Sequence, residues 1–170
     1  MLRFTTFLEE GVNDPSIFKA VFLAGGPGSG KSFMVGKTAL TSFGMKLINS
    51  DPAFERQLAK AGLKATPDDI FTDKGQAARR VAKTLTAKQM ALAVNGRLGL
   101  VIDGTGKDFN KISGQASKLK QLGYEVAMIF VNTDLETAIN RDKKRARTLG
   151  AKEVTGMWKD VQKNIGKFQN

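Results

Sequence analysis

Eight residues in the first fifth of the chain have the composition of a phosphate-binding loop. They run Gly25-Gly26-Pro27-Gly28-Ser29-Gly30-Lys31-Ser32, with two glycines five positions apart followed by Lys and Ser. Glycines let a loop wrap so closely around a phosphate that its backbone N–H groups point inward, and the helix that follows adds its positive end. The lysine reaches the outer phosphates, and the serine hydroxyl binds magnesium. This pattern predicts that the chain binds ATP with Mg²⁺. The expected contacts are Gly26, Gly28, Ser29, Gly30, Lys31 and Ser32.

Two aspartates follow apolar stretches that should be strands. Asp51 ends Ile48-Asn49-Ser50-Asp51, and Asp103 ends Leu100-Val101-Ile102-Asp103. In a parallel sheet both would project toward the phosphate site, where a carboxylate can accept a proton from an attacking hydroxyl or hold magnesium. An acid after an apolar strand is the usual magnesium-binding arrangement of P-loop proteins, which favours Asp103 as a metal residue. The alternatives are a helix N-cap at Asp51 and a turn aspartate at Asp103.

A basic segment later in the chain contains Arg141 and Arg145, four positions apart. On a helix they would share one face, and two guanidinium groups can clamp the oxygens of a phosphoryl group in transfer. Because they lie far along the chain from the phosphate loop, they would arrive by closure of a lid at about residues 133–153. The alternative is an exposed basic helix that pairs with Asp142 or with nothing.

The chain contains neither Cys nor His, which limits its chemistry. Thiolate nucleophiles, Ser-His-Asp triads, Cys/His zinc sites and disulfides are all excluded. A general base must therefore be a carboxylate.

Short apolar stretches alternate with helical patterns, which predicts an α/β fold. We expect a P-loop NTPase-type parallel sheet of four to five strands, with helices on both faces and a helical lid. The expected strands are 21–24, 46–49, 98–103 and 126–131, and the expected helices are 30–42, 52–61, 75–94, 108–122, one beginning at Thr133, and 154–168.

Three details of these helices are specific enough to test. In the 75–94 helix, apolar residues recur at a helical spacing that predicts one buried stripe. The 108–122 helix should be capped by Gly123. Thr133 with Glu136 resembles a capping box at the start of the next helix. The predicted stripe consists of Ala78, Val81, Ala82, Leu85 and Leu92.

The 170 residues suit a single domain, residues 1–170, in which the structure of residues 1–18 is not predicted. No signal peptide or membrane span is evident, so we expect a cytoplasmic protein with no membrane partner. The net charge is +11, and the last 30 residues hold nine basic and three acidic side chains. This excess could simply keep the protein soluble, or it could meet phosphates of a single-stranded nucleic acid. The basic residues beyond the arginine pair include Lys143, Lys144, Arg147, Lys152, Lys159 and Lys163.

Taken in order, these motifs resemble P-loop kinases of the group formed by bacteriophage polynucleotide kinases and zeta toxins. The resemblance rests on the phosphate loop, the Asp51 strand end, Ile102-Asp103-Gly104-Thr105-Gly106-Lys107, Gly123-Tyr124 and the arginine pair, and it covers most of the chain from about Val21. It implies that Asp51 is the general base on the acceptor hydroxyl, and that the two arginines contact the ATP phosphates. The catalytic residues are then Asp51, Lys31, Arg141 and Arg145. The metal residues are Ser32 and Asp103, and the acceptor-binding residues are Asp103, Thr105 and Arg56.

The chain departs from this group in two ways. Pro52 directly follows Asp51, and Phe54 and Arg56 stand three and five positions after the aspartate, which puts the acceptor role of Arg56 in doubt. The chain is also shorter than the zeta toxins, which build part of their sugar-nucleotide site from extensions.

Three functions stay open at this point. The first is an ATP-dependent kinase of a hydroxyl on a nucleic acid or nucleotide, including a hydroxymethylated base in DNA. The second is a nucleotide-sugar kinase like the zeta toxins. The third is a nucleotide-binding switch or ATPase, which is weakened because no water-positioning Gln stands near the second strand. The oligomeric state is not predicted.

Overall fold

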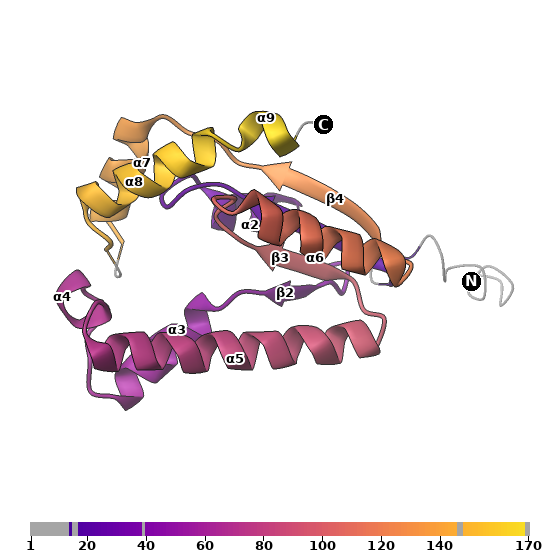
Figure 1. Cartoon of the computed structure of the whole chain (residues 1–170), viewed down its shortest axis with the longest axis horizontal. Coiled ribbons are helices and arrows are strands. Elements are labelled where there is room, and N and C mark those ends of the chain that lie inside the picture. Colours follow the sequence, from indigo (N-terminus) through magenta and orange to yellow (C-terminus); the bar gives the residue numbers. More distant parts are fainter. Residues whose placement is uncertain (1–13, 15–16, 39, 146–147, 169–170) are drawn as a thin grey trace, which may run out of the picture.

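The computed structural model describes residue 14 and residues 17–38, 40–145 and 148–168 of the chain. Its centre is a four-stranded sheet in which all neighbouring strands are parallel, with the order β2-β3-β1-β4 (Figure 1). The expected α/β fold with a parallel sheet is confirmed. The strands are β1 (Lys19–Ala24), β2 (Lys46–Ile48), β3 (Leu100–Asp103) and β4 (Glu125–Phe130).

Helices connect the strands in the described part of the chain and continue after β4. Because the strands are parallel, each crossover carries the chain back to the amino edge of the sheet, and all strands end on one side. Figure 1 shows their arrowheads pointing to the same end of the molecule. The helices are α2 (Lys31–Thr38), α3 (Asp51–Lys60), α4 (Pro67–Ile70), α5 (Asp73–Asn95), α6 (Phe109–Gln121), α7 (Leu135–Lys143), α8 (Ala151–Gln162) and α9 (Ile165–Phe168).

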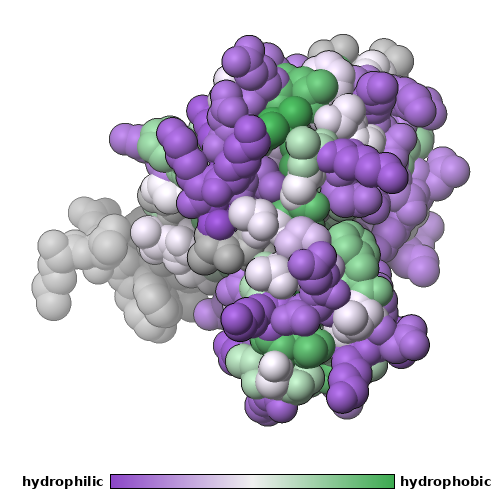
Figure 2. All heavy atoms as spheres, turned by 90° about the vertical axis from the view of Figure 1, so that its left-hand side faces the viewer, coloured by the Kyte–Doolittle hydropathy of each residue, from purple (hydrophilic) through white to green (hydrophobic). Residues whose placement is uncertain are grey.

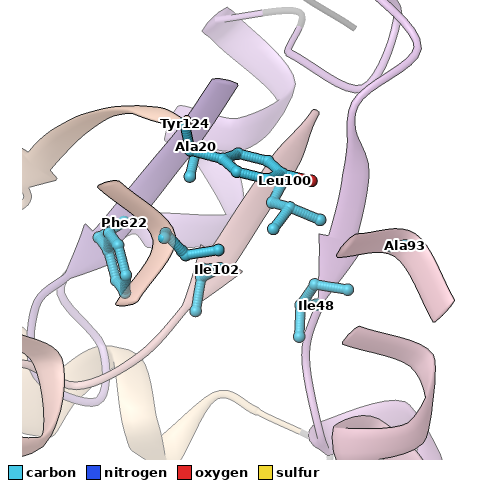
Figure 3. Packing of buried hydrophobic residues seen from close by; sticks show 8 residues of the cluster. Ala20, Phe22, Ile48, Ala93, Leu100, Ile102 and Tyr124 are labelled. Carbon is cyan, nitrogen blue, oxygen red and sulfur yellow. The ribbon is translucent and has the colours of Figure 1, made fainter. Parts of the chain in front are cut away.

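One face of the sheet packs against α5 and α6. Phe22, Ile48 and Leu100 from three strands meet Ala93 of α5 and Leu119 of α6 in a buried cluster (Figure 3). Alternate residues of each strand point to this side, as the two-residue period of a strand requires. The opposite face is covered by α2 and the segment after it. There Leu23 and Val101 are buried together with Met45.

A third apolar cluster lies beyond the sheet, where α3 and α4 pack against the first half of α5. Phe54 and Leu58 of α3 and Ile70 of α4 surround Ala78 and Ala82 of α5. Small alanine side chains let the helices approach closely. This cluster fixes the position of α3, and therefore of the residues that begin it.

The predicted apolar stripe of the longest helix is only half right. Ala78 and Ala82 are buried, but Val81, Leu85 and Leu92 are 46%, 44% and 72% exposed. The reason is that α5 packs against α3 and α4 through its first half and against the sheet through its last turns, so no single stripe stays buried along its length.

Several helix ends also differ from expectation. The N-cap of α7 is Asp134, whose side chain accepts from the Thr137 amide at 2.7 Å, so the capping box at Thr133 was wrong. The expected 154–168 helix begins earlier, at Ala151, and breaks into α8 and α9 around Asn164. The short helix α4 was not predicted. Gly123, at φ +90°, follows the end of α6 as expected.

None of the helices in the described ranges is long and apolar enough to cross a membrane. The expectations for residues 1–13, and those for Arg147, fall outside the described residues.

Candidate active site

The phosphate-binding loop follows β1 at the carboxyl edge of the sheet and leads into α2. Three of its glycines have positive φ: Gly25 at +153°, Gly28 at +72° and Gly30 at +102°. A Cβ on Gly25 would lie 2.4 Å from the Val131 carbonyl oxygen, and one on Gly28 would lie 2.4 Å from that of Ala138. Only glycine fits these two positions, because both the backbone conformation and the neighbouring backbone exclude a side chain. The loop therefore lies directly against the end of β4 and against α7.

Lys31 is folded back over this loop. Its Nζ donates to the carbonyl oxygens of Gly25 at 2.6 Å and Gly26 at 3.3 Å. Burial lowers the pKa of Lys31 below the usual lysine value, and the nearby Arg145 lowers it too, while the carboxylates of Asp103 and Asp51 oppose the shift. The ammonium group is thus held against the carbonyls of the loop.

The two predicted carboxylates lie at this edge and are linked through Asn49. The Asn49 Nδ2 donates to Asp103 Oδ2 at 2.9 Å, and its Oδ1 accepts from the Asp51 amide at 2.8 Å. Burial raises the pKa of Asp103 above the usual aspartate value, and the Lys31 ammonium opposes this shift. The structure therefore brings both acids to the side of the sheet where Lys31 lies.

Asp51 is the first residue of α3, and the residue at the N-cap position is Ser50. The N-cap role considered for Asp51 is therefore wrong by one position. Pro52 occupies the next position, where a helix tolerates proline because its first amides have no partner within the helix. The departure noted at Pro52 thus does not disturb the start of the helix.

The loop after β3 is tied to the phosphate-binding loop through its backbone. The Gly104 amide donates to the Leu23 carbonyl at 3.0 Å, and the Gly25 amide donates to the Thr105 carbonyl at 3.1 Å. These bonds hold Asp103 and Thr105 in register with the end of β1. The hydrogen bond to the Thr105 carbonyl thus fixes the position of this residue.

Arg141 already contacts the phosphate-binding loop. Its Nη1 donates to the carbonyl oxygens of Gly28 at 3.2 Å and Ser29 at 3.3 Å. Arg145 lies beyond the end of α7 at Lys143, so the argument that the two arginines share one helix face was wrong. Both nevertheless line the same cavity, because the chain bends back after α7.

Asp142 fixes this bend. It is 3% exposed, and its Oδ2 accepts from the amides of Leu149 at 3.0 Å and Gly150 at 3.1 Å. The sequence suggested a surface ion-pair partner, but the side chain instead holds the two ends of the α7–α8 connection together. Arg145 belongs to this connection.

Replacing Asp142 by alanine should lower the free energy of unfolding by about 1–3 kcal/mol, because two backbone amides lose their acceptor. Asp142→Asn should lose less, since its amide oxygen can still accept. Urea denaturation followed by circular dichroism measures both. Asp160→Ala is the matched control: its carboxylate forms an exposed ion pair with Lys163 at 3.6 Å, so its effect should stay within about 0.5 kcal/mol. Equal stability of Asp142→Ala and the control would contradict this role.

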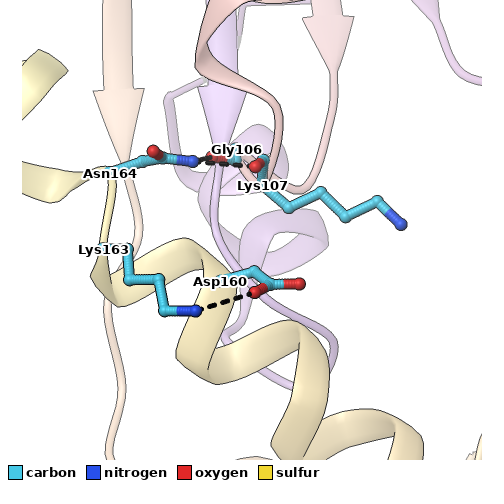
Figure 4. Close-up of polar contacts among 5 residues, drawn as sticks. All are labelled: Gly106, Lys107, Asp160, Lys163 and Asn164. Carbon is cyan, nitrogen blue, oxygen red and sulfur yellow. Dashed lines mark hydrogen bonds and ion pairs between the residues drawn. The ribbon is translucent and has the colours of Figure 1, made fainter.

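Helix α8 and the break between α8 and α9 contact the segments that surround the site. Trp158 Nε1 donates to the Thr133 carbonyl at 2.9 Å, and its Cα lies 4.0 Å from a Cβ built on Gly26. Asn164, buried at the break between α8 and α9, donates to the carbonyls of Gly106 at 3.1 Å and Lys107 at 2.8 Å (Figure 4). The C-terminal helices therefore hold both loops that surround the phosphate site.

One cavity of about 510 Å³ collects most of the predicted site residues. It opens at the carboxyl end of the sheet, the face seen in Figure 2, where hydrophilic side chains predominate. Arg56 does not line it; that residue lines a neighbouring cavity of about 340 Å³ formed with Leu47 and Leu85. The predicted residues that line the larger cavity are Gly26, Gly28, Ser29, Gly30, Lys31, Ser32, Asp51, Asp103, Thr105, Arg141 and Arg145.

The same cavity contains residues that the sequence analysis missed. Asn49 was quoted within a strand end but given no role. Arg79 and Lys83 lie on α5, four residues apart, so their shared helix face was the available signal. Lys107 and Lys111 follow β3. Nothing in the sequence indicates that the first half of α5 lines the same cavity as the phosphate-binding loop.

The chemistry of the donors fits a magnesium ion held together with a nucleotide. Asp103 Oδ1 is buried and has no hydrogen-bond partner among the described residues. Ser32, the second residue of α2, lines the same cavity beside Lys31. Within the described residues no group of three or more His, Cys, Asp or Glu side chains could hold a metal by itself. Magnesium bound with a nucleotide keeps phosphate oxygens and water as its other ligands, so one carboxylate and one hydroxyl are sufficient.

One protein family matches most of the chain. The sequence model of the zeta toxin family matches residues 9–167. Comparison with curated proteins gives no match.

Solved structures share the fold. A structure of the PezAT chromosomal toxin-antitoxin system of Streptococcus pneumoniae superposes with a TM-score of 0.71 at 16% identity, over 97% of this chain and 70% of the other. The Pnkp1/Rnl/Hen1 RNA repair complex gives 0.66 at 16% identity, over 90% and 47%. AvrRxo1-ORF1:-ORF2 with ATP gives 0.68 at 15%, over 92% and 51%. The chain thus spans about half the length of the last two.

Proposed function

We propose, for a chain that belongs to the zeta toxin family, that this P-loop kinase transfers the γ-phosphate of ATP to a hydroxyl group of a nucleotide or nucleic acid. One observation carries the proposal: the phosphate-binding loop, two carboxylates and two arginines line a single cavity. A nucleotide switch needs no carboxylate placed to receive a proton from an acceptor. A cytoplasmic location, a single domain and binding of single-stranded nucleic acid belong to the same proposal.

Each residue of the cavity has its own role in the proposed reaction. Asp51 accepts the proton of the acceptor hydroxyl, whose oxygen forms the new bond to the γ-phosphorus. The bond from that phosphorus to the oxygen bridging the β-phosphate breaks, and ADP leaves with the electron pair. Lys31, Arg141 and Arg145 neutralise the charge that spreads over the phosphate oxygens. The loop amides of Gly26, Gly28, Ser29 and Gly30 hold the remaining phosphates.

Ser32 and Asp103 would hold magnesium, which supplies further neutralisation of the phosphate oxygens. Asn49 positions Asp103 by donating to its Oδ2. The second carboxylate oxygen, Oδ1, takes no part in this hydrogen bond. Thr105 and Arg56 remain candidate acceptor contacts.

A transfer assay with γ-labelled ATP tests the proposal against nucleosides, oligonucleotides and nucleotide sugars. Label transferred to a nucleoside or oligonucleotide hydroxyl supports it. Release of ADP and inorganic phosphate at the same rate with and without every acceptor would indicate an ATPase or switch instead.

Membership of the zeta toxin family favours a second candidate, a nucleotide-sugar kinase. In the same assay this function predicts label on the nucleotide sugar and none on oligonucleotides. The two candidates share the phosphate-binding loop and the base, so they are separated by their acceptors.

A polynucleotide acceptor predicts salt-dependent binding through the basic C-terminal segment. Lys159 and Lys163 are exposed on and just after α8. Each phosphate contact releases counterions, so the logarithm of the affinity for a single-stranded oligonucleotide should fall linearly with the logarithm of salt concentration. Replacing both lysines by glutamine should reduce that slope by about 1.4 without changing ATP affinity. Fluorescence anisotropy of a labelled oligonucleotide across a salt series measures it.

The matched control changes two exposed lysines in the last turn of α6, Lys118 and Lys120. That turn lies next to the start of β4, at the amino edge of the sheet, so the control should keep the original slope. Absence of oligonucleotide binding at low salt would reject the polynucleotide acceptor and favour the nucleotide-sugar candidate.

A further inference from the structure

Helix α5 presents an apolar stripe that the described part of the fold does not bury. Its members Val81, Leu85 and Leu92 are 46%, 44% and 72% exposed. At about 100° per residue, the three side chains lie within roughly 40° of one another around the helix axis. None of them belongs to the three buried apolar clusters formed by the described residues. The sequence thus provides a helical apolar face that these clusters leave open.

The stripe lies away from the proposed active site. Arg79 and Lys83, the α5 cations that line the large cavity, are on nearly the opposite side of the helix. Figure 1 shows α5 along the lower side of the molecule, below the sheet. A partner that covers the stripe would therefore bind outside the nucleotide cavity.

The charge along the stripe has one sign. Lys74 and Lys88 lie in line with its apolar residues, and both are exposed. Neither has an ion-pair partner among the residues that the structure describes. The whole of α5 contains five basic residues and one acidic residue, Asp73 at its first position. The face is therefore both apolar and positively charged.

A hollow beside the stripe has the same character. The cavity of about 340 Å³ that Leu85 lines is bounded by other apolar side chains and by Arg56, and its described lining contains no acidic residue. An apolar side chain of a partner laid along α5 has room to enter it. The apolar residues of this lining are Leu47, Pro52, Ala53 and Leu85.

We propose that this face of α5 binds an acidic amphipathic helix of another protein. Apolar side chains of that helix cover the stripe, and its carboxylates pair with Lys74 and Lys88. The inference goes beyond the proposed phosphoryl transfer and does not depend on it, because it concerns a protein partner on a different surface.

A helix suits the stripe better than an extended segment does. Val81 and Leu92 are separated by about three helical turns, or about 16 Å. Side chains at spacings of four and seven residues form a ridge, and the ridges of one helix pack into the grooves of another. Burial of the exposed leucines favours association, while the facing charges select the sign of the partner.

Other occupants fit this face less well. A second copy of the chain would bring the lysines of two stripes together without a carboxylate of the stripe between them. A nucleic acid would pair with the lysines but leave the apolar side chains in water. At a membrane surface, the lysines would interrupt the apolar face that an interfacial helix inserts among the lipids. An acidic amphipathic helix satisfies both the charge and the apolar residues.

Peptide binding to the full chain tests the inference. The probe is a fluorescent, helix-forming peptide of about 18 residues, with leucine at heptad positions a and d and glutamate at e and g. One control peptide has lysine in place of glutamate, and the other has serine in place of leucine. We expect the acidic leucine peptide to bind at least about 10-fold more tightly than either control, measured by fluorescence anisotropy.

The affinity should depend on residues of the stripe. Leu92→Ser should weaken binding of the acidic peptide about 10-fold, and Lys88→Gln about 3-fold. Leu122→Ser and Lys118→Gln are the matched controls, because these exposed residues lie at the end of α6, and neither should change the affinity. Because Leu92 is 72% exposed, its replacement should leave the fold intact, which circular dichroism checks.

The inference is overturned if the acidic peptide does not bind, if the basic peptide binds equally well, or if Leu92→Ser leaves the affinity unchanged. Weakening by Lys83→Gln but not by Leu92→Ser would place the peptide in the large basic cavity and overturn it too. The same holds for a dimer in sedimentation velocity, an oligonucleotide complex or binding to phosphatidylserine vesicles that Leu92→Ser abolishes. These results would assign the stripe to a second copy, a nucleic acid or a membrane.

Discussion

Replacing Lys31 by alanine should abolish measurable phosphoryl transfer, a loss of at least about 10²- to 10³-fold. The Lys31 ammonium is the cation that the phosphate-binding loop itself supplies, and it already lies against the Gly25 and Gly26 carbonyls. The other cations that line the cavity belong to different elements, so no second basic residue of the loop can replace the Lys31 ammonium. Single-turnover transfer from γ-labelled ATP, with saturating acceptor, measures this loss.

Lys37→Ala is the matched control. Lys37 is an exposed lysine in the last turn of the same helix, and its Nζ lies 5.5 Å from the Phe33 ring centroid. Transfer should be unchanged in this variant. If Lys31→Ala retained full ATP turnover, the assignment of the loop to phosphate binding would have to be abandoned.

Replacing Asp51 by asparagine should lower transfer by about 10²- to 10⁴-fold while ATP affinity stays the same. Asparagine keeps the size and polarity of the side chain but cannot accept the proton of the acceptor hydroxyl. The Asp51 contact to Asn49 runs through its backbone amide and survives the change, so α3 should begin at the same residue. Rapid-quench transfer and equilibrium binding of a labelled ATP analogue separate the two quantities.

Asp68→Asn provides the control, since Asp68 is an exposed acid in the first turn of the short helix α4 and does not line the cavity. It should transfer at the normal rate. A normal rate in Asp51→Asn as well would leave Asp51 with a role only in the first turn of its helix.

The sequence alone was sufficient to predict the features that depend on local patterns. The phosphate-binding loop requires glycine at particular positions, and the strands show as short apolar stretches before polar residues. Because the strands are parallel, Asp51 and Asp103, which stand at strand ends, should lie at the same edge of the sheet. In the structure both lie there, linked by Asn49. These predictions needed no knowledge of how the helices pack.

Features that depend on how the helices pack could not be predicted from the sequence in this way. Arg79 reaches the cavity because α5 turns its first half toward α3 and its last turns toward the sheet, which also exposes Leu92. Periodicity shows that a helix has an apolar face but not where its partner changes along its length. Asp142 likewise looked like a surface charge, because the backbone amides that donate to it lie seven and eight residues ahead across a bend.

The order of strands has a consequence for how the chain acquires its shape. The central strand β1 pairs with β3, at Ala20 and Leu100, and with β4, at Lys19 and Glu125. Both pairings join segments that are far apart along the chain, so the entropy of closing long loops must be overcome before either pairing stabilises the sheet. The loop after β1 packs on Val131 and Ala138, which come later still. We therefore expect its native conformation to form late in folding.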